Sequence, residues 1–238
     1  MGIQCVDCVA EGNKGVRQAR TTFGGALSNR DTLVTKVVIG ACLLMFLAQQ
    51  VMPTNVFYQL ALVNGPFLGS FAQGSWWQPV TSAFLHAGVL HLLLNMYALW
   101  ICGQYLEQLL GRLRFTALYA VSALGGAVGG LVLPGTAGSV MVGASGAIFG
   151  LFAALFVVNR HLGRQTGQIA VLIGLNFFIG VFVAGISWQA HLGGLVTGAL
   201  VAAAMARGRR GNAVVQWAGT AAVAVLVLAG LAYGAALY

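Results

Sequence analysis

The amino-acid sequence predicts an all-α membrane protein, a polytopic helix bundle that crosses a bilayer several times. Of its 238 residues, 59% are hydrophobic and only 7% are charged. Soluble domains carry about 25% charged residues, and a water-soluble fold with so few charges could not cover its surface. The apolar residues also fall into seven runs, separated by short connections except for the long one between the first two runs. Composition and spacing therefore predict the same class.

Each apolar run is a candidate membrane-spanning helix. A helix rises about 1.5 Å per residue and needs about 20 residues to cross the hydrocarbon core. Most runs are near that length, but the fourth is short, so we expect its helix to begin below the membrane surface. The predicted spans are 33–52, 87–104, 113–133, 145–159, 168–186, 188–206 and 214–237.

The basic residues predict the orientation of the spans. All twelve Lys and Arg precede or open the first span or lie in every second connection after it. Cytoplasmic segments are enriched in Lys and Arg. The chain is therefore predicted to have a cytoplasmic N-terminus, seven crossings of the plasma membrane and an extracytoplasmic C-terminus. The net charge of +8 reflects this topology, so we expect the lipid bilayer, and not nucleic acid, as a partner.

Cys5 and Cys8 form a Cys-x-x-Cys pair near the N-terminus. Such a pair is half of a zinc knuckle, and a structural zinc site needs four ligands. Two interpretations stay open: a remnant of a longer zinc-ribbon-like extension, or two free thiols on a disordered tail. Residues 11–28 are polar and predict a linker. No cofactor and no other metal site is expected.

Four polar side chains are predicted to share one depth near the outer face: His91 and Asn95 of the second span, Ser145 of the fourth and His191 of the sixth. Polar groups inside spans are unfavourable and usually mark function. His91 and Asn95 are four residues apart and share a helix face. His86 is expected in the loop before this helix, in a supporting role.

Small residues explain how two of these groups could meet. Ser145 lies in Gly143-Ala144-Ser145-Gly146, and a Gly-x-x-x-Gly stretch follows it, as another follows His191 from Gly194. Such faces allow close helix approach. If these two faces meet, Ser145 and His191 come within hydrogen-bond reach. Phe149 either stacks on the His191 ring or packs as an ordinary helix residue.

A carboxylate is not expected at this depth. The topology places the acidic residues on or near the cytoplasmic side: Asp7, Glu11, Asp31 and Glu107. Serine chemistry would then use a dyad, in which packing and not an acid orients the imidazole.

These motifs resemble those of the rhomboid family of intramembrane serine proteases. The resemblance covers about 76–198 and rests on His86-x4-His91-x3-Asn95, Gly143-Ala144-Ser145-Gly146, Ala190-His191-x2-Gly194 and the segment from Glu107 to Arg112. It implies a six-helix core, with a seventh helix appended, that cleaves transmembrane protein substrates. We therefore divide the chain into a tail (1–30), a core (31–206) and the appended helix (207–238).

The resemblance also implies residue roles. Ser145 is the expected nucleophile and His191 its base, while His91, Asn95 and the Ser145 N–H serve the oxyanion. The sequence departs from the family pattern at one position: Gln78 follows two tryptophans where the family usually has Arg. A tether of the first loop by charge is therefore in doubt.

Two alternative functions remain. An inactive rhomboid-like protein would bind or escort membrane proteins, although such proteins usually lack the Ser or the His. A transporter or metal channel would use His86, His91 and His191, but these histidines do not share one helix face and no acidic residue lies at their depth.

Overall fold

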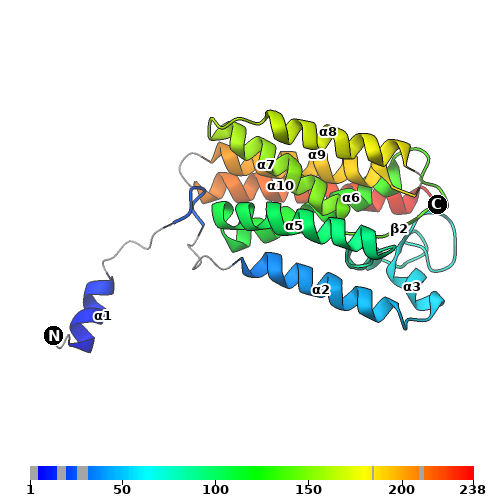
Figure 1. The fold of residues 1–238 in the computed structure, drawn as a ribbon, viewed down its shortest axis with the longest axis horizontal. Helices are drawn as coiled ribbons and strands as arrows, with labels where there is room; N and C mark the ends of the chain where they lie inside the picture. Colours follow the sequence, from blue (N-terminus) through cyan, green and yellow to red (C-terminus); the bar gives the residue numbers. More distant parts are fainter. Residues whose placement is uncertain (1–4, 15–19, 26–31, 184, 209–211) are drawn as a thin grey trace.

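The structure is a computed structural model that describes residues 5–14, 20–25, 32–183, 185–208 and 212–238. Its long helices lie side by side along the long axis, with α2 and α8 at opposite edges in Figure 1. The helices are α1 (Val6–Lys14), α2 (Leu33–Gln49), α3 (Thr54–Leu60), α4 (Gln78–Thr81), α5 (Val89–Leu110), α6 (Arg112–Val132), α7 (Ser145–His161), α8 (Gly167–Phe182), α9 (Trp188–Arg207) and α10 (Ala213–Ala236). A 3-10 turn (Ser82–Phe84) follows α4, and β1 (Leu62–Val63) pairs antiparallel with β2 (Val140–Met141).

Each of the seven predicted spans corresponds to one long helix, so the predicted membrane helix bundle is confirmed. Four helices, α5, α6, α9 and α10, are long and apolar enough to cross a membrane, and α2, α7 and α8 are shorter apolar helices. The exact count of seven crossings stays a prediction. The first span was predicted to reach residue 52, but α2 ends at Gln49, shortly before Pro53, since a residue before proline disfavours helix.

Glycines bring α6, α7 and α9 into backbone contact. A Cβ added at Gly194 of α9 would collide with the carbonyl oxygen of Gly146 in α7, and one at Gly198 with that of Gly150. The predicted meeting of the two Gly-x-x-x-Gly faces is thus observed. Helix α6 also takes part, which we did not predict: its Gly126 lies against Gly146. Three helices, and not two, form the close-packed centre.

The carboxylate of Glu107, buried in α5, caps the N-terminus of α2. Its Oε1 accepts from the Val34 N–H at 3.0 Å, and its Oε2 accepts from the N–H and the hydroxyl of Thr35 at 2.9 and 2.8 Å. These donors satisfy N–H groups that have no partner within a helix. Glu107 therefore joins two helices at the end of the bundle away from Ser145.

A buried amide joins α10 to the same end. The Gln216 oxygen accepts from Arg114 Nε at 2.7 Å, and its nitrogen donates to the carbonyls of Met205 (3.0 Å) and Phe23 (3.3 Å). The Phe23 side chain is buried. The linker prediction for residues 11–28 is therefore wrong at residues 20–25, which pack onto the bundle because Phe23 has an apolar site to fill.

Near the N-terminus, the structure contains helix α1, whereas one of our two interpretations of the cysteine pair had placed it on a disordered tail. Cys8 lies in α1 and Cys5 directly before it, and both are exposed free thiols. Hydrogen bonds from the N–H groups of Cys8 and Asp7 lower the pKa of Cys5.

Gln78 holds the first loop without a charge. Its side chain is fully buried. The amide nitrogen donates to the carbonyls of Gly69 (2.7 Å) and Tyr58 (3.3 Å), and the amide oxygen accepts from the Val63 N–H at 3.1 Å. Neutral hydrogen bonds thus tether the loop that forms one side of the cavity described below.

Candidate active site

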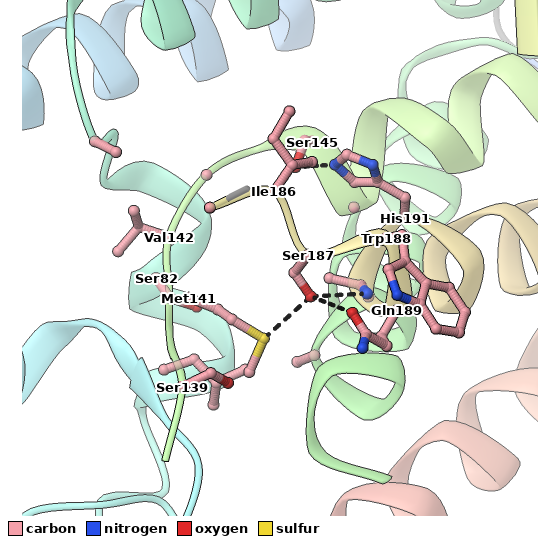
Figure 2. A pocket seen from close by; sticks show the side chains of 18 of the residues that line it. Ser82, Ser139, Met141, Val142, Ser145, Ile186, Ser187, Trp188, Gln189 and His191 are labelled. Carbon is pink, nitrogen blue, oxygen red and sulfur yellow. Dashed lines mark hydrogen bonds between the residues drawn. The ribbon is translucent and has the colours of Figure 1, made fainter. Parts of the chain in front are cut away.

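Ser145 and His191 meet at the ends of two helices. Ser145 is the first residue of α7, and His191 lies in the first turn of α9. The Ser145 hydroxyl oxygen is 3.0 Å from His191 Nε2, within hydrogen-bond distance, as the dashed line in Figure 2 marks. Backbone contact between α7 and α9 makes this distance possible, since larger residues at the glycine positions would separate the helices.

Phe149 supports the imidazole from one face. Its ring stacks on that of His191, with the centroids 4.1 Å apart and the planes within 11°. Of the two alternatives for Phe149, the structure favours stacking. His191 is 8% exposed, and its Nδ1 has no hydrogen-bond partner in the described part of the chain. The ring is therefore held by contacts and not by a carboxylate.

A cavity of about 720 Å³ opens beside this pair. Its walls come from the first loop, the α6–α7 connection, α5, and the segment that joins α8 to α9, with Ser145, His191 and His91 among the lining residues. The volume lies within the range of ligand sites, roughly 300–1,000 Å³. Ser187 and Met141 face each other across the view in Figure 2. Because Ser145 lines this cavity, its hydroxyl is accessible from a space with both polar and apolar walls.

The structure separates the two residues expected at the oxyanion, His91 and Asn95, and the expected supporting residue His86. His91 lines the cavity, and its Nδ1 accepts from the Ala87 N–H at 3.3 Å. Asn95 is buried, and its amide nitrogen donates to the His91 carbonyl one turn earlier at 2.8 Å. The loop residue His86 is buried with its ring edge against His91, at a centroid distance of 5.2 Å. The structure thus places His91 beside the cavity, with Asn95 and His86 behind it.

The backbone before Ser145 has a conformation that requires glycine. Gly143 has φ +126°, and its N–H donates to the Ser82 carbonyl at 2.9 Å. A Cβ at Gly143 would stand 2.7 Å from the His91 ring. The N-terminus of α7 also has no side-chain cap, and the first N–H groups of a helix have no partner within it. Backbone donors therefore lie near the Ser145 hydroxyl.

Comparison with known proteins identifies the family of this chain. A family model described as the Rhomboid domain matches residues 73–208. The chain belongs to the rhomboid family. It is 32% identical over 194 residues to the rhomboid protease GluP of Bacillus subtilis. The matched region covers 79% of this chain and 38% of GluP.

Other relatives extend the comparison. The rhomboid protein YdcA of the same organism is 38% identical over 58% of this chain and 71% of its own length. RHOMBOID-like protein 5 of Arabidopsis thaliana is 34% identical over 53% of the chain and 43% of its own length. This chain thus spans less than half of two of these three relatives. The family and the apolar helices together make it a multi-pass membrane protein.

Two features of this rhomboid site were missed by sequence reasoning. Ser187 caps α9, its hydroxyl accepting from the Ala190 N–H at 3.3 Å. A serine just before an apolar helical run is a recognisable cap signal. Gly180 of α8 lies against His191, and no local pattern distinguishes it from other glycines of the chain.

The histidines of this rhomboid do not gather as a transporter or metal channel would need. His86 and His91 are neighbours, whereas His191 pairs with Ser145. Among the described residues, no group of three or more His, Cys, Asp and Glu side chains is placed to hold a metal ion. The geometry therefore favours chemistry at the serine.

Proposed function

We propose that this protein is an intramembrane serine endopeptidase that cleaves transmembrane segments of membrane proteins near the outer face of the bilayer. The observation that carries the proposal is the 3.0 Å contact between Ser145 Oγ and His191 Nε2 on the wall of a cavity inside an apolar helix bundle. Membership of a family with named proteases supports it.

The proposed reaction begins with proton transfer from the Ser145 hydroxyl to His191 Nε2 as the oxygen attacks the substrate carbonyl. His191 then gives this proton to the leaving amine, which departs as the acyl-enzyme forms. Water from the cavity, deprotonated by the same nitrogen, then attacks the acyl carbon. The bond between this carbon and the Ser145 oxygen breaks, and His191 returns the proton to that oxygen as the new carboxyl terminus leaves. In this cycle Nδ1 keeps its proton throughout, so the base tautomer is the one with hydrogen on Nδ1.

The oxyanion needs donors aimed at the place where its charge develops. We assign this role to the Ser145 N–H at the start of α7, where the helix dipole also favours negative charge, and to the His91 ring. Asn95 belongs to the proposed set as the neighbour whose amide holds the His91 carbonyl. The amide nitrogen of Asn95 carries a second N–H, which is the donor that we assign to the oxyanion. His86, Gly143, Gly146, Phe149 and Gly194 are the proposed supporting residues.

The substrate must unwind before it can be cut, since a helix's own hydrogen bonds occupy its carbonyls. We therefore expect cleavage where small or helix-weakening residues lie near the outer face. The same proposal includes the location and the orientation of the chain: the plasma membrane, a cytoplasmic N-terminus and an extracytoplasmic C-terminus. It also includes the division into tail, core and appended helix. Packing of Gln216 of α10 against the core supports treating 207–238 as an attached element.

A fluorophosphonate probe tests the proposal directly, because it reacts covalently with an activated serine. The full chain in detergent should be labelled and should cleave a reporter substrate with one transmembrane segment. Ser145→Ala should abolish both, and cleavage should fall by at least about 10⁴-fold. The matched control is Ser122→Ala, a buried serine of α6 whose hydroxyl has no hydrogen-bond partner among the described residues.

The control variant should be labelled and active like the original chain. A folded chain that takes no label and cuts no substrate would instead favour the binding or escort function. Cleavage that persists in Ser145→Ala would remove Ser145 from the mechanism.

A further inference from the structure

Helix α8 lies at the edge of the bundle, beside α7 and α9 (Figure 1). Within α8, which the structure describes throughout, only Gly180 is buried. Most of its large apolar side chains, Phe178 and Phe182 among them, are exposed on the surface of the bundle, which lipid covers in a membrane. Ile173 and Phe177 are half-buried and pack against the core from the same helix, so Gly180 is the position at which the α8 backbone itself is enclosed.

What Gly180 meets is the imidazole of His191. A Cβ built at Gly180 would stand 3.1 Å from Nδ1 and 3.6 Å from Cε1 of that ring, and 3.5 Å from Cγ2 of Ile186. The first distance is shorter than most real Cβ contacts. The α8 backbone therefore lies directly against the Nδ1–Cε1 edge of the ring, where a side chain would not fit without displacement.

Three contacts together enclose the ring. Ser145 occupies Nε2, Phe149 covers one face, and Gly180 lies at the Nδ1 edge. In Ser-His-Asp triads a carboxylate at Nδ1 orients the imidazole. Here Nδ1 has no hydrogen-bond partner among the described residues, and Glu107 is engaged in capping α2. Orientation must then come from steric contact.

We infer that Gly180 is a positioning residue for the general base: the α8 backbone, free of a Cβ, fixes the imidazole of His191 in line with Ser145. This inference rests on the proposed protease function. It gives α8 a role in catalysis through one main-chain contact. Any side chain at residue 180 would shift the ring or α8 by a few tenths of an ångström and misalign proton transfer.

Gly174 provides a matched control on the same helix, since a Cβ there would meet nothing within 4 Å. Gly→Ala and Gly→Val at residues 174 and 180 add the same side chains to the same helix, each at a position now held by glycine. The full chain would be measured for kcat and KM on the reporter substrate, for the rate of fluorophosphonate labelling, and for melting temperature.

For Gly180→Ala, kcat and the labelling rate should fall about tenfold while KM stays within about twofold, because small misplacements of reacting groups slow catalysis steeply. Gly180→Val should lose more. Both Gly174 variants should match the original chain, and the melting temperatures of the two Ala variants should agree within a few degrees.

Several results would overturn the inference. One is a Gly180→Ala enzyme with the kcat of Gly174→Ala. Another is a raised KM at unchanged kcat, which would make α8 a wall for substrate only. A third is a Gly180→Ala enzyme whose kcat falls while its melting temperature also drops well below that of Gly174→Ala, because the loss would then be one of folding. If Gly180→Val does not fold, the Ala pair decides. An original chain without labelling or cleavage would contradict the proposed function instead.

Discussion

Helices α7 and α8 are similar in length and both strongly apolar, yet they occupy opposite environments. Eleven residues of α7 are buried, from Gly146 to Asn159, whereas only Gly180 is buried in α8. The glycines of α7 are four residues apart and form one face, while Gly167, Gly174 and Gly180 of α8 are seven and six residues apart. Of these two apolar helices, the one whose small residues form a close-packing face enters the core, as expected where small residues let helices approach.

This difference also separates two kinds of support for the candidate site. Contacts among α6, α7 and α9 determine where Ser145 and His191 lie. The close contact of Gly180 in α8 with the His191 ring is, by our inference, what fixes how this ring is turned. Substitutions in the first region should damage fold and activity together, and substitutions in the second should damage activity alone.

The largest effect is expected for Gly194→Ala at the centre of the core. The added methyl group would collide with the Gly146 carbonyl, so we expect a loss of about 1–3 kcal/mol in the free energy of unfolding and a strong loss of fluorophosphonate labelling. Denaturation in mixed micelles and labelling measure the two effects. Gly174→Ala serves as the control and should show no loss of stability, since alanine is favoured over glycine in a helix by up to about 1 kcal/mol. Equal stability of the two variants would contradict the proposed contrast.

A medium effect is expected for Glu107→Gln, far from the site. An amide keeps the shape but replaces one acceptor oxygen that receives two hydrogen bonds from Thr35. The free energy of unfolding should fall by about 1–2 kcal/mol, whereas kcat at a temperature well below melting should be unchanged. A marked loss of kcat in the folded variant would show that the α2 cap communicates with the dyad.

The smallest effect is expected for Phe149→Leu. Leucine keeps apolar volume but removes the stacked ring, which is worth about 0.5–1.5 kcal/mol. If this contact orients His191, kcat should fall about two- to tenfold with little change in melting temperature. Combined with Gly180→Ala, the losses should be non-additive because both residues contact one ring. Strict additivity would indicate that the two contacts act independently.

Much of the fold and the site could be predicted from the sequence. Apolar run length located all seven long helices, and the positions of Ser145 and His191 within them predicted their shared depth. The Gly-x-x-x-Gly stretches predicted the contact that brings these residues together. These are local properties of the chain, readable because crossing a bilayer requires long apolar segments and close packing requires small residues.

Other features were decided by the tertiary structure. The sequence did not indicate that Gly180 contacts His191, that Phe23 packs onto the bundle or that Asn95 turns toward its own helix. The Gly-x-x-x-Gly stretch from Gly126 in α6 carries the same signal as those of α7 and α9, but only the packed structure shows which helices it brings together. In water, a polar face shows which side of a helix points outward. Most sides of these spans are apolar, so beyond the faces that the glycines mark, the rotation and register of the helices emerge only when all of them pack together.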